Sequence, residues 1–225
     1  MSKIINWGIL GPGKIAKKFA LGLSYVPNAN LYAAASRSLE KAKDFSAEMG
    51  ADKAYGSYTE MLNDPKVDAI YIATPHVFHY EHTLLCLKHK KPVLCEKPFA
   101  MNKDQVKEMI DFAQKQDTFL MEAMWTHFLP HFKYTKEVIK SGKYGKVLAM
   151  EADFGFDAPF NANSRIYNKS LGGGSLLDIG IYPIFAALSF LGKPEKIEAT
   201  AKMTKTEVDA RCHATFFYPE NVKAE

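Results

Sequence analysis

Cysteine is scarce in this sequence, and its scarcity excludes two classes of protein. The chain of 225 residues contains three cysteines, Cys86, Cys95 and Cys212, an odd number at wide spacing. Small secreted scaffolds carry dense, even sets of cysteines, and zinc knuckles carry closely spaced pairs. We therefore expect three reduced, structural thiols and no metal bound to them.

Long apolar runs are also missing, as is any large excess of one charge. The longest run, Ile181–Leu191, contains a proline and is too short to cross a bilayer, and the first ten residues show no secretory signal. The 29 basic and 25 acidic residues give a net charge of +4, and the one dense basic cluster, at 88–91, closes a helical pattern. We therefore expect a cytoplasmic protein that binds neither membrane nor nucleic acid.

The first half of the chain alternates short apolar strands with amphipathic helices. Strands are predicted at 4–10, 31–35, 68–74, 92–96 and 119–122. Helices are predicted at 14–25, 39–49, 79–89 and 103–115. This alternation indicates a parallel, doubly wound sheet with helices on both faces, an α/β Rossmann domain at 1–122.

The second half, 123–225, follows a different pattern. Helices are predicted near 131–140 and toward Leu191, and strands at 146–156, 196–203 and 209–218. The pattern indicates an α+β domain with a largely antiparallel open sheet. Residues after 218 are typical of a turn and the start of a return strand, so we expect this sheet to be incomplete and the domain truncated at Glu225.

The first chemical motif is GPGKIA, directly after the first predicted strand. Gly11, Gly13 and Ala16 match GxGxxA, in which small residues let backbone N–H groups and a helix N-terminus approach a pyrophosphate. Lys14 and Ile15 complete the first helical turn and join them as candidate cofactor contacts. The alternative is a plain glycine turn, but the position between a strand and a helix favours a dinucleotide site.

The second predicted strand ends in the sequence AAASRS. An NAD enzyme usually carries Asp or Glu here, because a carboxylate accepts hydrogen bonds from the ribose 2′-hydroxyl. Ser36 and Arg37 instead offer a hydroxyl and a guanidinium, which suit a 2′-phosphate. The sequence therefore favours NADP over NAD, with Arg37 as an ordinary surface residue as the alternative.

Histidines follow the strand at 68–74. His76, His79 and His82 are spaced by threes, which raises the possibility of a metal site, but such steps turn around a helix and no carboxylate or thiolate completes the set. Ligands of open α/β sheets bind at the carboxyl ends of the strands. We therefore expect Thr74, His76 and His79 to lie at the cofactor, without a metal.

The stretch PVLCEKP ends another predicted strand with Glu96, Lys97 and Pro98. A lysine directly after a buried strand is costly to place unless it is used. The carboxyl end of a parallel strand puts Glu96 and Lys97 on the same edge as Gly11 and Thr74, so we expect them at the nicotinamide end of the crevice. The alternative is a Glu–Lys pair that only closes the strand.

Four motifs, in order along the chain, resemble the Gfo/Idh/MocA oxidoreductase family. They are GPGKIA, EKP at 96–98, MEAMWTHFLP at 121–130 and GGGSLLDIGIYPI at 172–184. Within the family, the chain is similar to the branch of dimeric dihydrodiol dehydrogenase and glucose–fructose oxidoreductase. The resemblance implies an NADP-binding domain at 1–122, a substrate-binding and dimerisation domain at 123–225, further strands beyond Glu225 and a homodimer.

The resemblance also implies roles for residues at matching positions. Lys97 matches a lysine that contacts cofactor ribose and substrate, and Asp178 matches the aspartate of the GGxxxD segment. Tyr182 matches the expected proton donor and acceptor. Trp125 matches an aromatic residue beside the substrate pocket, and Arg165 an arginine that faces the active site as a cofactor and substrate contact.

Asp178 and Tyr182 stand four residues apart, which would put both on one helix face. Gly180 and Pro183 interrupt this pattern, and the proline is expected to kink the helix or begin a new one. Without the resemblance, Tyr182 would be interpreted as a core or rim aromatic residue.

These motifs together predict an NADP-dependent oxidoreductase that transfers a hydride between nicotinamide and a secondary alcohol or carbonyl of a sugar, polyol or dihydrodiol-like substrate. Tyr182 would carry the hydroxyl proton, Lys97 would stabilise the phenolate and Asp178 would orient the substrate or the lysine. A short-chain dehydrogenase would need a tyrosine with a lysine four residues later, and no tyrosine here has one. The alternative is a non-catalytic, NADP-sensing regulatory protein of the same fold.

Overall fold

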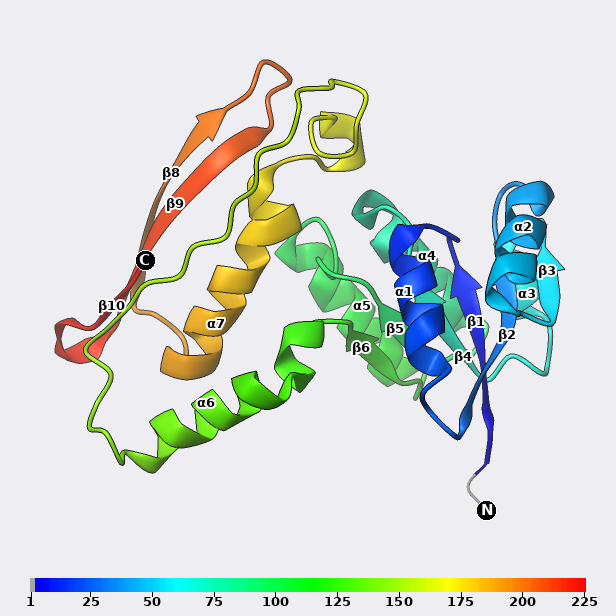
Figure 1. Ribbon diagram of the computed structural model, residues 1–225, viewed down its shortest axis with the longest axis horizontal. Helices are drawn as coiled ribbons and strands as arrows, with labels where there is room; N and C mark the ends of the chain where they lie inside the picture. The colour runs from blue at the N-terminus through cyan, green and yellow to red at the C-terminus, as the bar shows by residue number, and fades with distance from the viewer. Residues whose placement is uncertain (1–2) are drawn as a thin grey trace. The chain divides into compact units, whose positions relative to one another are not determined.

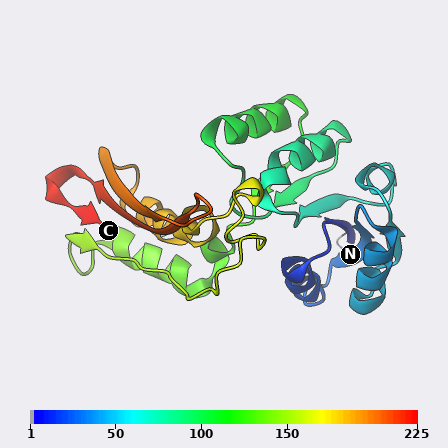
Figure 2. The ribbon, with the colours of Figure 1, turned by 90° about the horizontal axis from the view of Figure 1, so that it is seen from above.

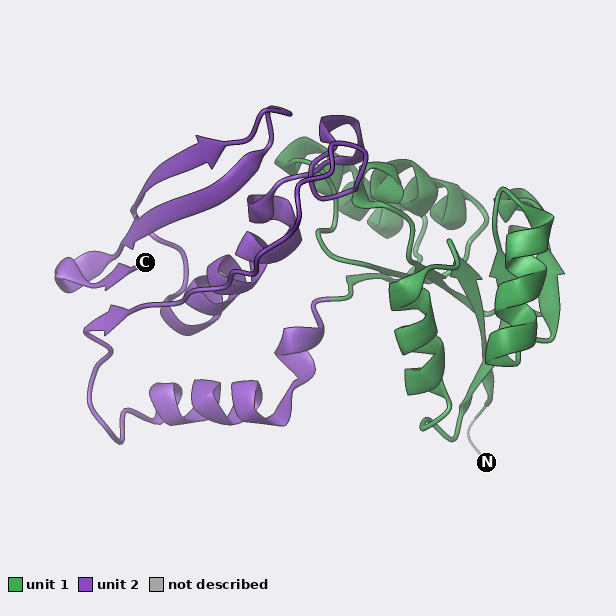
Figure 3. Ribbon diagram, turned by 45° about the horizontal axis from the view of Figure 1, so that its top comes forward, with its two compact units in different colours: residues 1–123 green, residues 124–225 purple. Residues whose placement is uncertain are grey.

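The computed structural model describes residues 3–225, which divide into two compact units. Unit 1 comprises residues 1–123 and unit 2 residues 124–225, and Figure 3 colours them separately. Unit 1 contains a six-stranded sheet and unit 2 a four-stranded sheet. Each unit therefore has its own sheet and its own hydrophobic core.

The sheet of unit 1 is parallel throughout. Its strands are β1 (Ile5–Leu10), β2 (Ala29–Ala35), β3 (Lys53–Tyr55), β4 (Ala69–Ile72), β5 (Val93–Cys95) and β6 (Leu120–Glu122). They lie in the order β3-β2-β1-β4-β5-β6, so the chain winds outward in both directions from β1 (Figure 1). The predicted doubly wound parallel sheet is confirmed, whereas β3 was missed because three residues are too few to show a periodic pattern.

Helices cover both faces of this sheet. They are α1 (Lys14–Leu23), α2 (Leu39–Met49), α3 (Tyr58–Leu62), α4 (His79–Lys88), which a 3-10 turn at His76–Phe78 precedes, and α5 (Lys103–Lys115). Alternate residues of a strand point to opposite faces. Ile9 accordingly packs with α1 and α2, and Leu10 packs with α3, α4 and α5. Both residues are fully buried, so β1 has a core on each side.

Unit 2 combines helices with a mixed sheet. Its helical elements are a 3-10 turn (Trp125–Phe128), α6 (Pro130–Ser141), a 3-10 turn (Lys169–Leu171), a π-helical turn (Leu176–Gly180), α7 (Ile181–Leu191) and a 3-10 turn (Pro219–Asn221). Its strands are β7 (Ala149–Met150), β8 (Lys196–Met203), β9 (Asp209–Phe217) and β10 (Lys223–Ala224). The order is β7-β10-β9-β8, with β7 parallel to β10 and the other pairs antiparallel (Figure 2). This sheet confirms the predicted α+β class.

The core of unit 2 lies between α7 and one end of the sheet. Ala187 of α7 is buried together with Phe216 of β9 and Ala224 of β10. Phe132 of α6 stacks on Phe185 of α7, with ring centroids 5.2 Å apart. All eight residues of β8 are exposed, so the packing of the unit concentrates near the junction of β9 and β10.

The long strand predicted at 146–156 is wrong. In the structure only Ala149–Met150 of this range is a strand. Beyond it, the Ala152 N–H donates one more hydrogen bond, to the Glu225 carbonyl at 2.9 Å. A strand forms only where a neighbouring strand accepts and donates its backbone hydrogen bonds. β10 provides such a neighbour for two residues, and it pairs with β9 only at Phe216 and Phe217.

The helical elements within Lys169–Leu191 together span 23 residues, a segment long and apolar enough by length and composition to cross a membrane. Length and composition do not distinguish such a helix from the core helix of a globular domain. In this unit α7 packs against the sheet through Ile184 and Ala187. The expectation that the protein binds no membrane stays a prediction.

Candidate active site

The loop between β1 and α1 has the form that a dinucleotide needs. Gly11 has a φ of +92°, and a Cβ on it would lie 2.6 Å from Thr74 Cγ2. Glycine is therefore required at 11 because two loops meet there. A Cβ on Gly13 would meet no heavy atom within 4 Å, so the backbone at the start of α1 is open to a ligand. Ala16 is fully buried and lets the helix lie close to the sheet.

The N-terminus of α1, like that of α4, has no side-chain cap, whereas the other three helices of unit 1 have one. Helices α2, α3 and α5 are capped by Ser38, Ser57 and Asn102, each of which accepts a backbone N–H of its first turn. Helix α1 begins after Gly13 with no such bond and no acidic residue in the first turn. Its first N–H groups and the positive end of its dipole thus fit a phosphate group. Lys14 and Ile15 are exposed on this turn.

At the end of β2 the structure presents cationic and hydroxyl groups. The Ser36 hydroxyl accepts the Ser38 N–H at 3.2 Å. Arg37 is exposed, and its guanidinium carbon lies 5.8 Å from the centroid of the Phe78 ring. These residues fit the predicted 2′-phosphate contact, which stays a prediction.

The ring of His79 ties two loops together. Its Nδ1 lies 2.8 Å from the Pro98 carbonyl and its Nε2 lies 2.9 Å from the Thr74 carbonyl, and the side chain is 1% exposed. Burial lowers the pKa of His79 to about 4, although both carbonyls favour the protonated ring. His76, also buried, lies with its ring 6.4 Å from that of His79.

His82 belongs to the same cluster. The Thr74 hydroxyl lies 3.0 Å from His82 Nδ1, and burial lowers the pKa of this ring to about 4 as well. The structure thus gives the rings of His79 and His82 partners in the loop after β4. A direct contact of Thr74, His76 or His79 with a cofactor stays a prediction.

Lys97 follows β5 in a loop held by carboxylates. Glu96 accepts a short hydrogen bond from the Tyr71 hydroxyl and another, at 3.2 Å, from the Lys97 N–H. Glu122, at the end of β6, accepts the Phe99 N–H at 2.9 Å. Burial raises the pKa of both Glu96 and Glu122. The Glu96 carboxylate, predicted as a cofactor contact, therefore also binds groups of its own unit.

In unit 2, the helix that carries Asp178 and Tyr182 changes its winding between them. Residues Leu176–Gly180 form a π-helical turn, and α7 begins at Ile181. Pro183 lies in the first turn of α7. The wider π-helical turn before it accommodates the missing N–H of the proline. The expected interruption near Gly180 and Pro183 is therefore a π-helical turn.

Asp209 holds the start of this helix. Its Oδ2 accepts the Ser175 hydroxyl at 2.7 Å and the Leu176 N–H at 2.6 Å. Gly174 has a φ of +123°, and a Cβ there would collide with Asp209 Oδ1. A Cβ on Gly173 would lie 2.6 Å from the Ile166 carbonyl oxygen. The glycine cluster thus allows Asp209 and a neighbouring loop to approach the helix.

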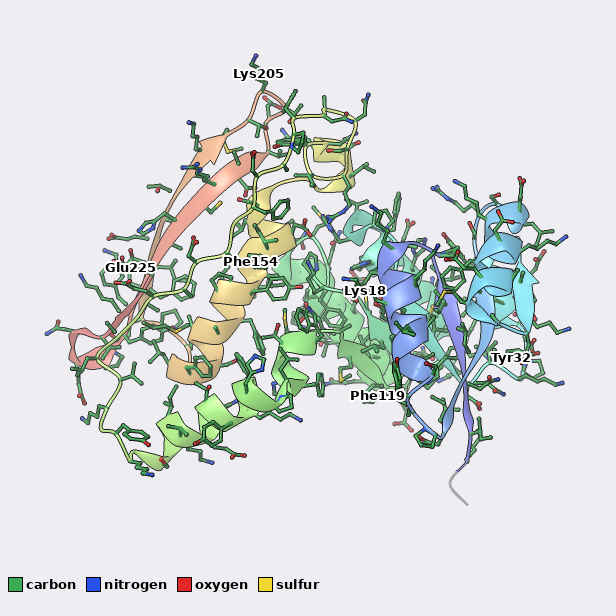
Figure 4. The ribbon with its side chains drawn as sticks, viewed as in Figure 1. Lys18, Tyr32, Phe119, Phe154, Lys205 and Glu225 are labelled. Atoms are coloured by element: carbon green, nitrogen blue, oxygen red, sulfur yellow. The ribbon has the colours of Figure 1, made fainter. Side chains whose placement is uncertain are left out.

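The hydroxyl oxygen of Tyr182 accepts a hydrogen bond from the indole N–H of Trp125 at 2.9 Å. The Phe154 ring, labelled in Figure 4, lies beside it with centroids 5.5 Å apart. Asp178 is 14% exposed in its side chain and pairs with Arg165 at 3.0 Å. The structure therefore brings the four predicted residues of unit 2 together as two bonded pairs.

Unit 2 contains a cavity of about 880 Å³ that Phe154 and Asp178 help to line. Its walls include Phe154 and Phe156 from the segment that follows β7, Asp178 from the π-helical turn and Cys212 from β9. Aromatic rings and a carboxylate in the lining suit a polyhydroxylated or aromatic ligand.

Glu122, His82 and Asp209 were not predicted as site residues. Glu122 ends a parallel strand, and this position is a signal that sequence reasoning had available. Asp209 begins an antiparallel strand 31 residues after Asp178, and no local pattern links the two. The Trp125–Tyr182 hydrogen bond likewise has no signature in the sequence.

Both halves of the chain match family models. Residues 5–124 match the model described as the oxidoreductase family, NAD-binding Rossmann fold, and residues 132–225 match the GFO/IDH/MocA C-terminal domain. The sequence is 40% identical over 222 residues to trans-1,2-dihydrobenzene-1,2-diol dehydrogenase of Mus musculus, a match that covers 97% of this chain and 66% of that protein. The Danio rerio enzyme of that name is 42% identical over 209 residues, which cover 91% and 62%.

Solved structures of similar proteins include a 3-ketoreductase from Actinomadura kijaniata in complex with TDP-benzene and NADP. It has a TM-score of 0.86 and 28% identity, over 99% of this chain and 68% of that one. An aldose-aldose oxidoreductase from Caulobacter crescentus complexed with glycerol has a TM-score of 0.90 and 27% identity, over 99% and 70%. The chain spans 66% of the length of the Mus musculus dehydrogenase and 62% of the length of the Danio rerio enzyme.

Proposed function

Because the chain belongs to the GFO/IDH/MocA oxidoreductase family, we propose that it is an NADP-dependent oxidoreductase acting on a secondary alcohol or carbonyl group. The observation that carries this proposal is the Tyr182 hydroxyl, which sits on a helix anchored by Asp209 and receives a hydrogen bond from Trp125. A positioned phenol is a group that can carry the proton of an alcohol.

NADP, when bound, supplies or accepts the hydride. The open backbone at Gly13 and the uncapped N-terminus of α1 would hold its pyrophosphate. Ser36 and Arg37 would hold the 2′-phosphate. The similar 3-ketoreductase was solved with NADP, which supports this cofactor over NAD.

Tyr182 moves the substrate proton in this proposal. The indole nitrogen of Trp125 can only donate, so its hydrogen bond stabilises negative charge on the Tyr182 oxygen. During oxidation the phenolate takes the hydroxyl proton of the alcohol, and during reduction the phenol returns it to the carbonyl oxygen.

Charged residues set the conditions for this transfer. In the proposed reaction the ammonium of Lys97 would contact the substrate oxygen and stabilise the charge that develops during proton transfer. Asp178 orients a substrate hydroxyl, and its ion pair with Arg165 holds the carboxylate in one direction.

A sugar, polyol or dihydrodiol is the proposed substrate. Phe154 and Trp125 beside Tyr182 suit the C–H face of a sugar or the ring of an aryl diol. The names of the relatives, a dihydrobenzenediol dehydrogenase and an aldose-aldose oxidoreductase, support this range of substrates.

We also propose a homodimer, which light scattering of the purified protein would test.

The experiment that tests the function is NADPH consumption, followed by absorbance, with a panel of sugars, inositols and dicarbonyl compounds. We expect turnover with at least one member and little with NADH. The control is a binding titration with NADP on the same preparation. Tight NADP binding without any turnover across the panel would instead support the alternative, a regulatory protein that senses NADP.

A further inference from the structure

Three consecutive residues, Lys97, Pro98 and Phe99, are each bonded through the backbone to an ionisable side chain. The Lys97 N–H donates to Glu96 Oε2 at 3.2 Å. The Pro98 carbonyl contacts His79 Nδ1 at 2.8 Å, and the Phe99 N–H donates to Glu122 Oε1 at 2.9 Å. The loop that presents Lys97 is therefore held at every residue.

Glu122 differs from Glu96 in where it is anchored. Glu96 adjoins Lys97 in the chain and is bonded to β4, where its N–H donates to the Ile72 carbonyl at 3.0 Å and its carboxylate accepts the Tyr71 hydroxyl. Glu122 ends β6, where it is the register partner of Cys95 at the end of β5, and the next residue, Ala123, donates its N–H to the Cys95 carbonyl at 2.7 Å. Glu122 therefore anchors the loop to strand β6 of the sheet.

A partly buried carboxyl at this place has an energetic cost that calls for a physical reason. Burial raises the pKa of Glu122, and the charge of Glu96 raises it further, while the Phe99 N–H and Lys97 oppose the shift. An apolar residue at the end of β6 would avoid this cost but would leave the Phe99 N–H without its acceptor.

We propose that Glu122 is a positioning residue for Lys97: by accepting the Phe99 N–H, it fixes the backbone that aims the lysine side chain. This inference rests on the proposed function in so far as Lys97 takes part in catalysis. A long side chain magnifies a small backbone rotation, and a displacement of about 1 Å at a reacting group can slow a reaction by about 100-fold.

Two substitutions separate the hydrogen bond from the charge. Glu122→Ala removes the acceptor, whereas Glu122→Gln keeps an oxygen that can accept the Phe99 N–H. The matched control is Asp64→Ala, because Asp64 is also a carboxylate of unit 1 that accepts side-chain and backbone hydrogen bonds. Its partners are the Tyr32 and Tyr55 hydroxyls and the Lys66 N–H.

The first two readouts use the protein without cofactor. Hydrogen exchange of the Phe99 amide is expected to quicken at least about 10-fold in Glu122→Ala and to stay near the parent rate in Glu122→Gln. Acetylation of Lys97 by acetic anhydride, measured by mass spectrometry, is expected to change only in Glu122→Ala. The Asp64→Ala variant should lower the unfolding temperature without altering either readout.

The third readout is steady-state kinetics. Glu122→Ala is expected to lower kcat about 10–100-fold with less than about a 3-fold change in KM for NADPH, and Glu122→Gln to recover most of kcat. Parent-like Phe99 exchange and Lys97 acetylation in Glu122→Ala would overturn the proposal, as would an equal loss of kcat in Asp64→Ala. If the parent consumed no NADPH, the proposed function would fail, while the first two readouts would still decide whether Glu122 positions Lys97.

Discussion

The oxygen of Tyr182 is shared between its own proton and the indole N–H of Trp125. Tyr182→Phe keeps the ring beside Phe154 and removes only the hydroxyl. We expect NADP affinity to survive and kcat to fall about 10²–10⁴-fold, the usual contribution of a positioned acid or base. Steady-state kinetics with a titration of NADP binding measure both.

The control for this substitution is Trp125→Phe, which retains the phenol but removes the donor. Its kcat should fall much less, by about 5-fold, as expected for one hydrogen bond of about 1 kcal/mol. Parent-like turnover by Tyr182→Phe would contradict the proposed proton transfer.

Arg37 governs cofactor preference in the proposed site. Arg37→Gln should weaken NADP binding by about 1.5–3 kcal/mol, the worth of a hydrogen bond to a charged group, and leave NAD binding almost unchanged. Calorimetric titration with both cofactors measures the difference, and Lys43→Gln on the exposed side of α2 controls for a general loss of positive charge. Equal losses for the two cofactors would show that Arg37 has a structural role.

The buried histidines make stability depend on pH. The pKa of His82 is about 4 in the folded protein, below the unfolded value of about 6.5, so the unfolded chain binds more protons at acidic pH. The stability linked to this ring is complete above pH 6.5 and falls as the pH drops toward 4. Between pH 6.5 and 5 the parent should lose free energy of unfolding, and we expect His82→Gln to reduce that loss by about 1–2 kcal/mol.

Urea unfolding at several pH values measures this effect as the difference between parent and variant. The raised pKa values of Glu96 and Glu122 act in the opposite direction, but both proteins share them and they cancel in the difference. The same pH slope in the two proteins would mean that His82 is not the linked group.

The helix of unit 2 that carries Asp178 and Tyr182 depends on glycine at its start. Gly174→Ala places a Cβ against Asp209 Oδ1 at a φ of +123°. We expect a loss of about 2–3 kcal/mol in the free energy of unfolding, because strain adds to the loss of the hydrogen bonds that Asp209 accepts. Gly155→Ala, where a Cβ would meet no atom within 4 Å, should change stability by less than about 0.5 kcal/mol.

Chemical denaturation of both variants, followed by the fluorescence of Trp7 and Trp125 and by circular dichroism, provides the measurement. Similar losses in Gly174→Ala and Gly155→Ala would show that the contact with Asp209 does not stabilise the helix.

For the whole molecule, the proposed reaction uses a residue from each unit. Lys97→Met and Tyr182→Phe should each lower kcat strongly, and because the two act in one step, the double variant should be little worse than the poorer single variant. Multiplied losses in the double variant would show that the residues act in separate steps.

The sequence by itself determined the class of each half of the chain. Alternating apolar and amphipathic segments predicted β1, β2, β4, β5 and β6 together with α1, α2, α4 and α5, because side-chain periodicity follows local backbone geometry; the five-residue helix α3 was not predicted. The GPGKIA, EKP and GGGS motifs indicated the family and the candidate residues, because each lies within a few consecutive residues.

Only the tertiary structure decided which groups meet. The strand at 146–156 fails beyond Met150, because a strand needs a neighbour that its own sequence does not encode. The contacts of Glu122 with Phe99, of Asp209 with Leu176 and of Trp125 with Tyr182 join residues 23 to 57 positions apart. Such contacts depend on how strands and helices pack, and the energy of burying a polar group then selects the partner that satisfies it.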